Sequence, residues 1–347
     1  MRLGLSTGSW GQGGEQDNLA LAVRAEELGY DVVWAAEAYG FDAATVLAWI
    51  GARTSRIHLG AGVLQIPGRT PAMTAMTAAS LDTLSGGRFR LGLGVSGPQV
   101  SEGWHGVRFA KPLGRTREYV DIVRMALARQ TVRYQGEHYT LPLPDGPGKA
   151  LRMTAAPSGH RVPVYLAAVN PRNLELCGEI ADGWLGIFLS PEFAGEQLAS
   201  IRAGLARSAD PDRPFELDAA VPVAVGPDVA ACADLIRPYA ALYVGGMGSR
   251  EQNFYNRLAR RMGYEEAAQQ VQDLYLAKQF RDAAAAVPQQ FIDDTSLLGP
   301  PERIAERLSR YAEAGLTTIS VAPAGRTLEE RLHCLEVVAK AAESAGL

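Results

Sequence analysis

The chain has 347 residues, 47% of them hydrophobic and 21% charged, and its 38 acidic and 34 basic side chains give a formal net charge of −4. This balance excludes a protein that binds nucleic acid mainly through charge, because such proteins carry a dense excess of Lys and Arg. No apolar run approaches the ~18 uninterrupted residues that span a bilayer, so we expect no membrane segment. Residues 1–5 form too short an apolar run for a secretory signal, so we expect a cytoplasmic protein.

The three cysteines, Cys177, Cys232 and Cys334, lie far apart and form no Cys-x-x-Cys pair. That excludes a disulfide framework and a thiolate zinc site, and it fits a reducing cytoplasm. The five histidines are scattered and no His-Glu-x-x-His motif occurs, so we expect no metal.

The first part of the chain alternates strand and helix patterns. Residues 3–7 are a short apolar run that ends in polar, Gly-rich residues, as a buried strand does. Helical spacing follows from Leu19 to Leu28, and Gly29 stands where a helix end favours positive φ. The cycle then repeats, with strands at 32–34, 57–63 and 89–94 and helices at about 43–52 and 71–84.

Two stretches interrupt this alternation. Residues 131–162 include a Pro/Gly-rich run and predict a hairpin with a loop. Strand patterns return at 164–167, 183–188 and 219–225. Residues 245–298 are polar and helical in pattern and carry the basic cluster Arg257, Arg260 and Arg261, which predicts a helical insertion.

The alternation resumes near the C-terminus. Pro301 opens a helix whose buried stripe includes Ile304 and Leu308, and Gly315 ends it before a strand at 318–321. Thr327, with Glu330 three residues on, is a capping box for a last helix.

The segments 27–33 and 313–319 repeat one pattern of helix end, glycine and strand start at the two ends of the chain. Eight strands separated by helices imply a parallel sheet, and eight such units favour a closed TIM-like (β/α)8 barrel over an open sheet. We therefore predict an α/β protein with a single barrel domain over 1–347, in which 131–162 and 245–298 are insertions.

In a parallel barrel the functional residues lie on the loops after the strands. Here those loops are 6–10, 37–42, 62–70, 95–105, 168–170, 188–190 and 322–325. Gly92 to Gly97 matches the Gly-x-Gly-x-x-Gly pattern of dinucleotide sites, but Pro98 and a long loop replace the helix that such a site needs. Pro98 also stands where a nucleophile elbow needs its second glycine.

Two polar residues on these loops and one basic cluster in the second insertion each have two possible roles. Glu37 directly follows a strand, where an acid either orders the next helix or serves a site. His105 is either a solvated loop histidine or a proton donor. The cluster of Arg257, Arg260 and Arg261 is either a solvated helix face or a site for an anionic tail.

Five groups of motifs, in order along almost the whole chain, resemble the bacterial luciferase-like monooxygenase superfamily, and more narrowly its branch that uses the deazaflavin coenzyme F420. They are Glu27 to Glu37; Arg53 to Val63; Arg69 to Ala72 with Leu81 to Gly94; Val164 to Ala168 with Ala181 to Trp184; and Gly299 to Arg303. The Leu84-Ser-Gly-Gly-Arg88 and Ala181-Asp-Gly-Trp184 segments are the most specific of these.

The resemblance implies roles for individual residues. A non-proline cis peptide is expected at about Gly62–Val63, where the family presses on the central ring of the cofactor. The implied cofactor-binding set is Ser6, Thr7, Glu37, Gly62, Val63, Ser96, Gly97, Ala167, Ala168, Val169 and Asn170. The last four fall where the family holds the cofactor phosphate, and a helix start followed by Pro171 suits an anion.

The chain departs from relatives that oxidise a sugar phosphate. Those place a His after the strand-two acid and an acid two residues after the position of Ser96, where this chain has Ala38 and Pro98. The remaining chemistry is hydride delivery to an electron-poor double bond, and the catalytic candidates are Glu37, His105 and Glu102.

The resemblance implies an F420-dependent oxidoreductase, expected to be a homodimer, that transfers a hydride between C5 of the deazaflavin and a small organic substrate. Trp10, Phe41, Trp104 and Phe188 are expected to line a pocket for a planar or apolar substrate. Two alternatives stay open, an FMN-dependent monooxygenase of the same superfamily and a non-catalytic F420-binding carrier.

Overall fold

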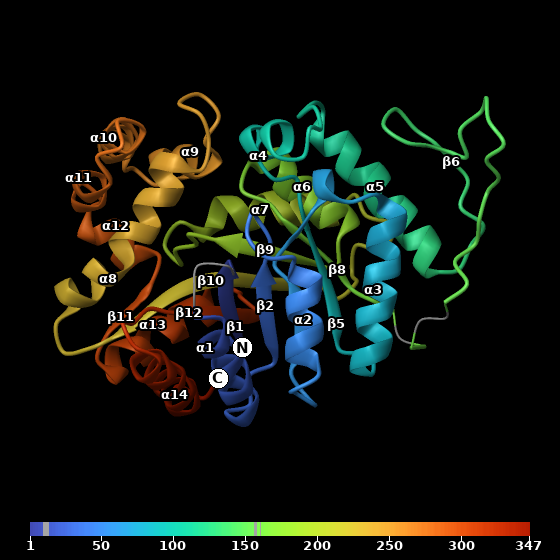
Figure 1. Ribbon diagram of the computed structural model, residues 1–347. Helices are drawn as coiled ribbons and strands as arrows, with labels where there is room; N and C mark the ends of the chain where they lie inside the picture. The colour runs from blue at the N-terminus through green and yellow to red at the C-terminus, as the bar shows by residue number, and fades with distance from the viewer. Residues whose placement is uncertain (10–13, 156–157, 160) are drawn as a thin grey trace.

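Eight parallel strands close into a barrel in the computed structural model, which describes residues 1–9, 14–155, 158–159 and 161–347 (Figure 1). The barrel strands are β1 (Arg2–Ser9), β2 (Val32–Ala36), β3 (His58–Ala61), β5 (Phe89–Gly94), β8 (Val164–Ala167), β9 (Gly183–Ile187), β10 (Glu216–Val225) and β12 (Thr318–Pro323). Since β10 pairs with both β9 and β12, the sheet has no free edge among these strands. The predicted TIM-like (β/α)8 barrel is confirmed.

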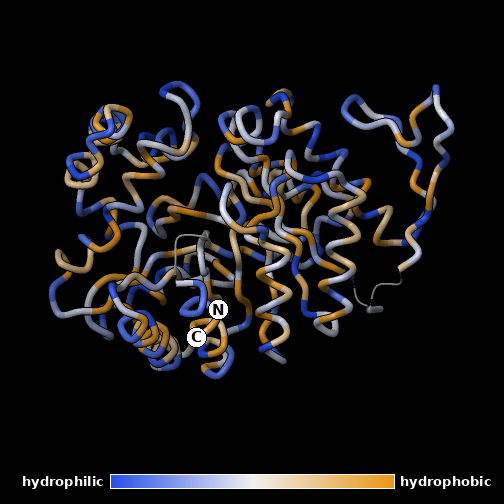
Figure 2. The backbone as a smooth tube through the Cα atoms, in the orientation of Figure 1, coloured by the Kyte–Doolittle hydropathy of each residue, from blue (hydrophilic) through white to orange (hydrophobic). Residues whose placement is uncertain are grey.

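Helices surround the barrel. They are α1 (Glu15–Glu27), α2 (Ala43–Gly51), α3 (Pro71–Ser85), α4 (Pro98–Gly103), α5 (Pro112–Leu127), α6 (Pro171–Ile180), α7 (Ala194–Leu205), α8 (Val229–Ala241), α13 (Pro301–Glu313) and α14 (Leu328–Ser344). The helix-end signals predicted from the sequence are present: Gly29 and Gly315 have positive φ, and Thr327 and Glu330 form a complete capping box. In Figure 2 hydrophobic residues concentrate on the strands and the inward faces of the helices.

The segments that interrupt the alternation lie on opposite sides of the barrel (Figure 1). On one side is the antiparallel pair β6 (Tyr134–Gln135) and β7 (Thr140–Leu141). On the other side, the π-helical turn η2 (Leu242–Gly246) leads into α9 (Phe254–Arg261), α10 (Glu265–Leu276), α11 (Phe280–Ala285) and α12 (Gln289–Asp294). The short strand β11 (Leu297–Gly299) then pairs with β10 and returns the chain to the barrel.

The third predicted strand is shorter than expected. Instead of one strand over 57–63, β3 ends at Ala61, the Gly62–Val63 peptide bond is cis, and β4 (Leu64–Gln65) pairs with β5 alone. The 3-10 turn η1 (Ile66–Gly68) follows. The cis peptide therefore lies where the sequence resemblance placed it.

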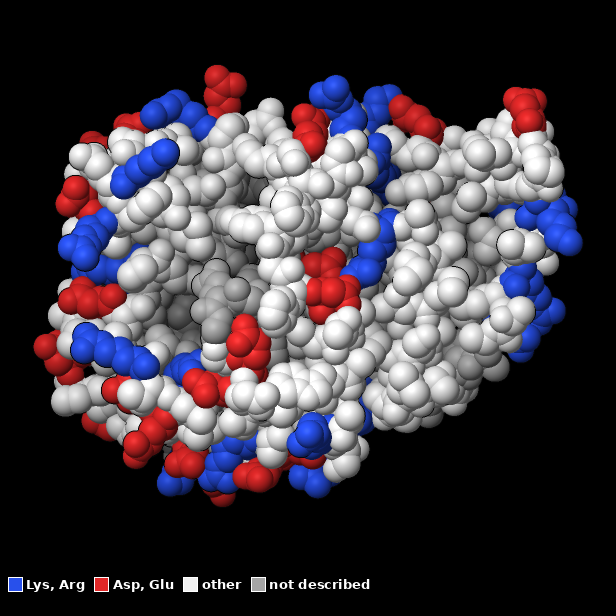
Figure 3. Space-filling view, viewed as in Figure 1, with Lys and Arg blue, Asp and Glu red and all other residues white. Residues whose placement is uncertain are grey.

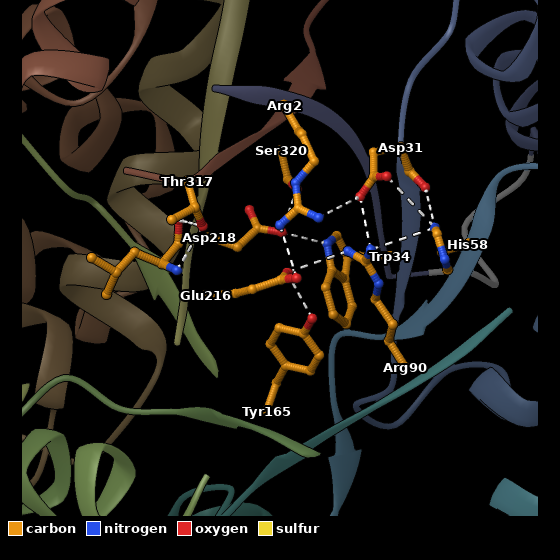
Figure 4. A network of polar contacts seen from close by, with 11 residues as sticks. Arg2, Asp31, Trp34, His58, Arg90, Tyr165, Glu216, Asp218, Thr317 and Ser320 are labelled. Carbon is orange, nitrogen blue, oxygen red and sulfur yellow. Dashed lines mark hydrogen bonds and ion pairs between the residues drawn. The ribbon is translucent and has the colours of Figure 1, made fainter. Parts of the chain in front are cut away.

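A polar network fills the end of the barrel opposite the strand carboxyl ends (Figure 4). Arg90 is 6% exposed and donates to Asp31 at 2.8 Å, while Glu216 accepts from Arg2 at 2.8 Å and from the Tyr165 hydroxyl at 2.7 Å. These contacts pair the buried charges of the network with one another.

Asp218 lies next to this network and is buried. One of its oxygens accepts from Trp34 Nε1 at 2.8 Å and from Ser320 Oγ at 3.0 Å, whereas its other oxygen has no partner among the described residues. Burial raises the pKa of Asp218 to about 6 in spite of these two hydrogen bonds, which lower it. The carboxyl group is therefore held more readily in its protonated form than in water.

We predict that Asp218→Asn changes how stability depends on pH. Because the pKa of Asp218 is raised on folding, its protonation favours the folded state below pH about 4, and this contribution is lost as the pH rises through 6. The difference between the two pKa values corresponds to roughly 3 kcal/mol. Relative to the wild type, the Asn variant should therefore gain unfolding free energy between pH 4 and pH 7, measured by urea denaturation.

Glu216→Gln is the matched control, since burial opposes ionisation of Glu216 but Arg90 and Arg2 outweigh it and lower its pKa. The stabilisation from ionised Glu216 is fully present above the ordinary pKa of a glutamate and is lost as the pH falls. Relative to the wild type, Glu216→Gln should therefore become less stable as the pH rises from 3 to 6. Two variants with the same pH trend would contradict the assignment.

Candidate functional site

The residues predicted to bind a cofactor lie along five strands that are neighbours in the barrel, in the order β1, β2, β3, β5 and β8. All of them are at the carboxyl ends of these strands or in the loops that follow. A bulge follows Ser6 in β1, and Thr7 Oγ1 donates to the Trp34 carbonyl of β2 at 3.0 Å. The fold thus brings together, on one rim, residues that are up to 164 positions apart, from Ser6 to Asn170.

Small residues end four of these five strands. Ala36, Ala61, Gly94 and Ala167 are the last residues of β2, β3, β5 and β8. A Cβ atom added to Gly94 would lie 2.6 Å from Cγ2 of Val63, so Val63 packs directly against the end of β5. The cis peptide and these short side chains therefore lie together at this part of the barrel mouth.

Glu37 interacts with the helix that follows it and with an arginine. Its Oε2 accepts from the Ala43 backbone N–H at the start of α2 at 3.2 Å and from Arg69 Nη2 at 2.7 Å. The two side chains are only 12% and 14% exposed, and Arg69 also contacts Asp42, the N-cap residue of α2. Of the two roles considered for Glu37, the structure shows the ordering of the next helix, α2.

His105 is linked to the same loop through Gln65. The Gln65 amide nitrogen donates to the Glu37 carbonyl at 3.2 Å, and its oxygen lies 2.6 Å from His105 Nε2. Because the amide oxygen can only accept, Nε2 of His105 must carry the proton. Neutral His105 then has its Nδ1 as the acceptor.

Glu102, in α4, makes its contacts with the loop that follows this helix. It accepts from the Phe109 backbone N–H at 3.0 Å and pairs with Arg108 at 3.4 Å. Both side chains of this pair are well exposed. Glu102 thus closes the loop between α4 and α5.

The helix α6 begins beside an arginine of the insertion. Asn170 is the N-cap residue but its side chain makes no capping bond, and no described residue accepts from the Arg172 backbone N–H. Arg261, at the end of α9, donates to the Val169 carbonyl at 3.0 Å. A helix N-terminus and a guanidinium group therefore lie together next to β8.

The four predicted pocket residues have different environments. Trp10 lies outside the described residues. Phe41 and Trp104 are 49% and 67% exposed. Phe188 is 3% exposed, because its ring packs in a cluster with tyrosines of α8, η2 and α9 rather than at an open surface.

Sequence reasoning assigned no role to Gln65, Arg69 or these tyrosines. Tyr239 and Tyr243 are four residues apart, which places residues on the same face of a helix, and this spacing is the sequence signal that could have found them.

In Figure 3 the surface is hollowed between the α8–α9 segment and the centre of the barrel. Within the described ranges, no three His, Cys, Asp or Glu side chains form a metal-ligand set, and no helix is long and apolar enough to cross a membrane.

A closed parallel barrel with its polar loops on the carboxyl rim is the architecture of TIM-barrel enzymes. The family model for luciferase-like monooxygenases matches residues 4–318, and the chain belongs to this family.

Similar proteins were found in a bacterium and in archaea. A protein of Mycobacterium tuberculosis whose name assigns it, provisionally, to the coenzyme F420-dependent oxidoreductases is 44% identical over 328 residues, which cover 92% of this chain and 94% of that protein. The 5,10-methylenetetrahydromethanopterin reductase of Archaeoglobus fulgidus is 27% identical, over 85% of this chain and 86% of its own length. The solved F420-dependent tetrahydromethanopterin reductase of Methanopyrus kandleri has a TM-score of 0.81 at 22% identity, with 98% of each chain covered, and so shares the fold.

We predict that Glu37 and Arg69 are energetically coupled. In a double-mutant cycle with Glu37→Gln and Arg69→Met, the coupling free energy from urea denaturation should be roughly 0.5–3 kcal/mol, because each single change removes one member of a mostly buried ion pair. The exposed Glu102–Arg108 pair is the matched control and should give a coupling near zero. Equal coupling in the two cycles would contradict this reading of the site.

Proposed function

We propose that this protein is a cytoplasmic F420-dependent oxidoreductase that transfers a hydride between C5 of the deazaflavin and a small organic substrate. The observation that carries the proposal is the match, over 92% of the chain at 44% identity, to a protein named for coenzyme F420. Further support comes from the arc of small residues and polar loops on five adjacent strand ends. We also propose a homodimer, which light scattering would test.

The floor of the barrel mouth suits a flat ring system. Ala36, Ala61, Gly94 and Ala167 leave space above four neighbouring strands, and Val63 of the cis peptide packs at their centre. When bound, coenzyme F420 supplies a two-electron hydride at this floor, and the protein's share is to orient the reacting partners and exclude water.

The phosphate end of the cofactor fits the start of α6. Backbone N–H groups and the positive end of the helix dipole favour an anion there, and Arg261 adds a charge beside Val169. Coenzyme F420 carries a lactyl-oligoglutamate extension that FMN lacks. The basic end of α9 also carries Arg257, whose charge would suit this extension, whereas Arg260 is held by Asn256, Gln269 and Glu265.

Among the three catalytic candidates, the contacts favour His105 as the group that holds or moves a proton. Its Nε2 is fixed by Gln65 and no hydrogen bond joins its Nδ1 to a described residue, whereas Glu102 is engaged with the loop after α4. Glu37, held by Arg69 and α2, would position the loop on which the cofactor rests.

Cofactor binding tests the proposal directly. The purified protein is titrated with coenzyme F420 and, separately, with FMN, and the fluorescence of each cofactor is followed. We expect tight binding of F420 and weak binding of FMN. Tight binding of FMN alone would overturn the proposal in favour of an FMN-dependent monooxygenase.

A second measurement separates an enzyme from a carrier. Protein loaded with reduced F420 is mixed in a stopped-flow instrument with a panel of enones, quinones and aldehydes, and cofactor oxidation is followed. Oxidation by at least one class of compound is expected. Submicromolar cofactor binding without turnover of any compound would favour the carrier.

We predict that Arg261→Ala weakens the binding of F420 by roughly two- to fivefold, the effect of losing one solvent-exposed charge contact. Binding of a truncated deazaflavin without phosphate and tail should not change. The exposed Arg281 on α11, in the same insertion, provides the control Arg281→Ala, for which no change is expected. Loss of affinity for the truncated cofactor as well would contradict a role at the anionic end.

A further inference from the structure

The side chain of Gln65, in β4, is buried at the barrel mouth. It is 5% exposed, and Gln65 is paired in register with Gly94 of β5. Side chains alternate between the two faces of a strand, so residues paired in register share a face. A Cβ atom added to Gly94 would lie 2.6 Å from Cγ2 of Val63. The Gln65 amide therefore lies on the same side of β4 and β5 as Val63.

The neighbours of Gln65 determine how its amide group is oriented. The Glu37 carbonyl, 3.2 Å from the amide nitrogen, can only accept a hydrogen bond. The amide nitrogen, which can only donate, must therefore face Glu37, and the amide oxygen faces Nε2 of His105 at 2.6 Å. The reversed amide would place two acceptors against each other at Glu37. A main-chain carbonyl thus fixes the amide, and the amide fixes a proton on Nε2 of His105.

His105 is held at its main chain as well as at its ring. Its backbone N–H donates to the Val100 carbonyl at 3.1 Å, at the end of α4. The ring lies against Gly68 of η1, where an added Cβ atom would be 3.0 Å from Cε1 and 3.5 Å from Nδ1. The side chain is half-buried, and no hydrogen bond joins Nδ1 to a described residue. The ring is therefore fixed in place while Nδ1 keeps its bonding capacity.

The amide of Gln65 acts on the imidazole without adding a charge. A carboxylate at this place would stabilise the charged ring through its own charge, whereas the neutral amide accepts the same N–H from the neutral ring and from the charged ring. Because Nε2 keeps its proton in both states, the proton that the ring gains or loses is the one on Nδ1. Nε2 thus holds the ring, and Nδ1 is the atom that can exchange a proton.

We propose that Gln65 is a positioning residue that confines the exchangeable proton of His105 to Nδ1, and that Nδ1 exchanges this proton with the substrate during hydride transfer. When a hydride adds to one end of an electron-poor double bond, the electron pair of that bond moves to the other end. The Nδ1–H bond then breaks and gives that atom its proton, which leaves His105 neutral. In the reverse direction, neutral Nδ1 accepts the proton. The role of Nδ1 rests on the proposed function, whereas the positioning by Gln65 does not.

Nuclear magnetic resonance tests the positioning on the cofactor-free, full-length protein with isotope-labelled histidine, at pH ~8.5, where an ordinary histidine is neutral. A ring N–H that is held in a hydrogen bond exchanges with water slowly enough to be detected, and its nitrogen identifies the tautomer. The wild type should show a proton on Nε2 of His105 and none on Nδ1. The resonance is assigned by its loss in His105→Asn.

Variants of Gln65 and two controls complete this test. Gln65→Leu removes the acceptor and should abolish the Nε2 proton signal, whereas Gln65→Glu keeps an acceptor and should keep the signal. His58 is an internal control, because its Nδ1 lies 2.9 Å from the Asp31 carbonyl and should carry the proton in every variant. Gln272→Leu removes a buried glutamine of α10 and should leave the His105 signal unchanged. Circular dichroism checks the folding of each variant.

The role of Nδ1 is tested in the stopped-flow assay described above, with a compound that oxidises the reduced cofactor. Gln65→Leu should slow this oxidation by roughly 10- to 100-fold, which is part of the effect of a positioned proton donor. Its affinity for F420 should not change. Gln65→Glu should recover part of the rate, because it restores the acceptor for Nε2.

Three results would overturn the positioning role: a His105 proton on Nδ1 in the wild type, no detectable proton on either ring nitrogen, or an Nε2 signal that survives in Gln65→Leu. An unchanged oxidation rate in Gln65→Leu, or no turnover of any compound by the wild type, would overturn the role of Nδ1. The titration of F420 is independent of the resonance experiment. Failure to bind F420 with the Nε2 signal intact would refute the proposed cofactor and leave the positioning role standing.

Discussion

Closure of the parallel sheet is the constraint on which the rest of the structure depends. Because every pairing around the barrel is parallel and β10 joins β9 to β12, all eight strands run in the same direction around one axis. All strand carboxyl ends then lie on one rim and all amino ends on the other. The two rims have different contents, a buried network of charges around Arg90 and Asp218 at one end and polar loops with short side chains at the other.

Paired side chains on the functional rim hold loops that have no regular structure of their own. Arg69 joins the loop after β2 to the segment after β4 by its contacts with Glu37 and Asp42. Gln65 joins His105 to the Glu37 carbonyl. Three separate connections of the chain are therefore fixed to one another by a few mostly buried polar contacts, which is how a rigid barrel positions side chains that its strands do not carry.

The barrel could be predicted because each unit repeats a local signal. Gly29 and Gly315 end helices with positive φ, and apolar runs such as 89–94 are buried on both faces. The partners of Glu37 were not predictable from spacing, since Arg69 lies 32 residues away and meets it only through tertiary packing. For the same reason the contacts of Phe188, which was expected to line a substrate pocket, could not be predicted, since its ring packs against tyrosines more than 50 residues along the chain.

Both chain connections of the helical insertion lead to one strand of the barrel, β10. The chain leaves β10 through α8 and returns through β11, which pairs with β10 again. The two ends of this excursion are thus held a short distance apart whatever the intervening helices do. An evolving lineage could lengthen, shorten or replace this segment, and so reshape the part of the barrel mouth that Arg261 borders, while inheriting the barrel scaffold beneath it unchanged.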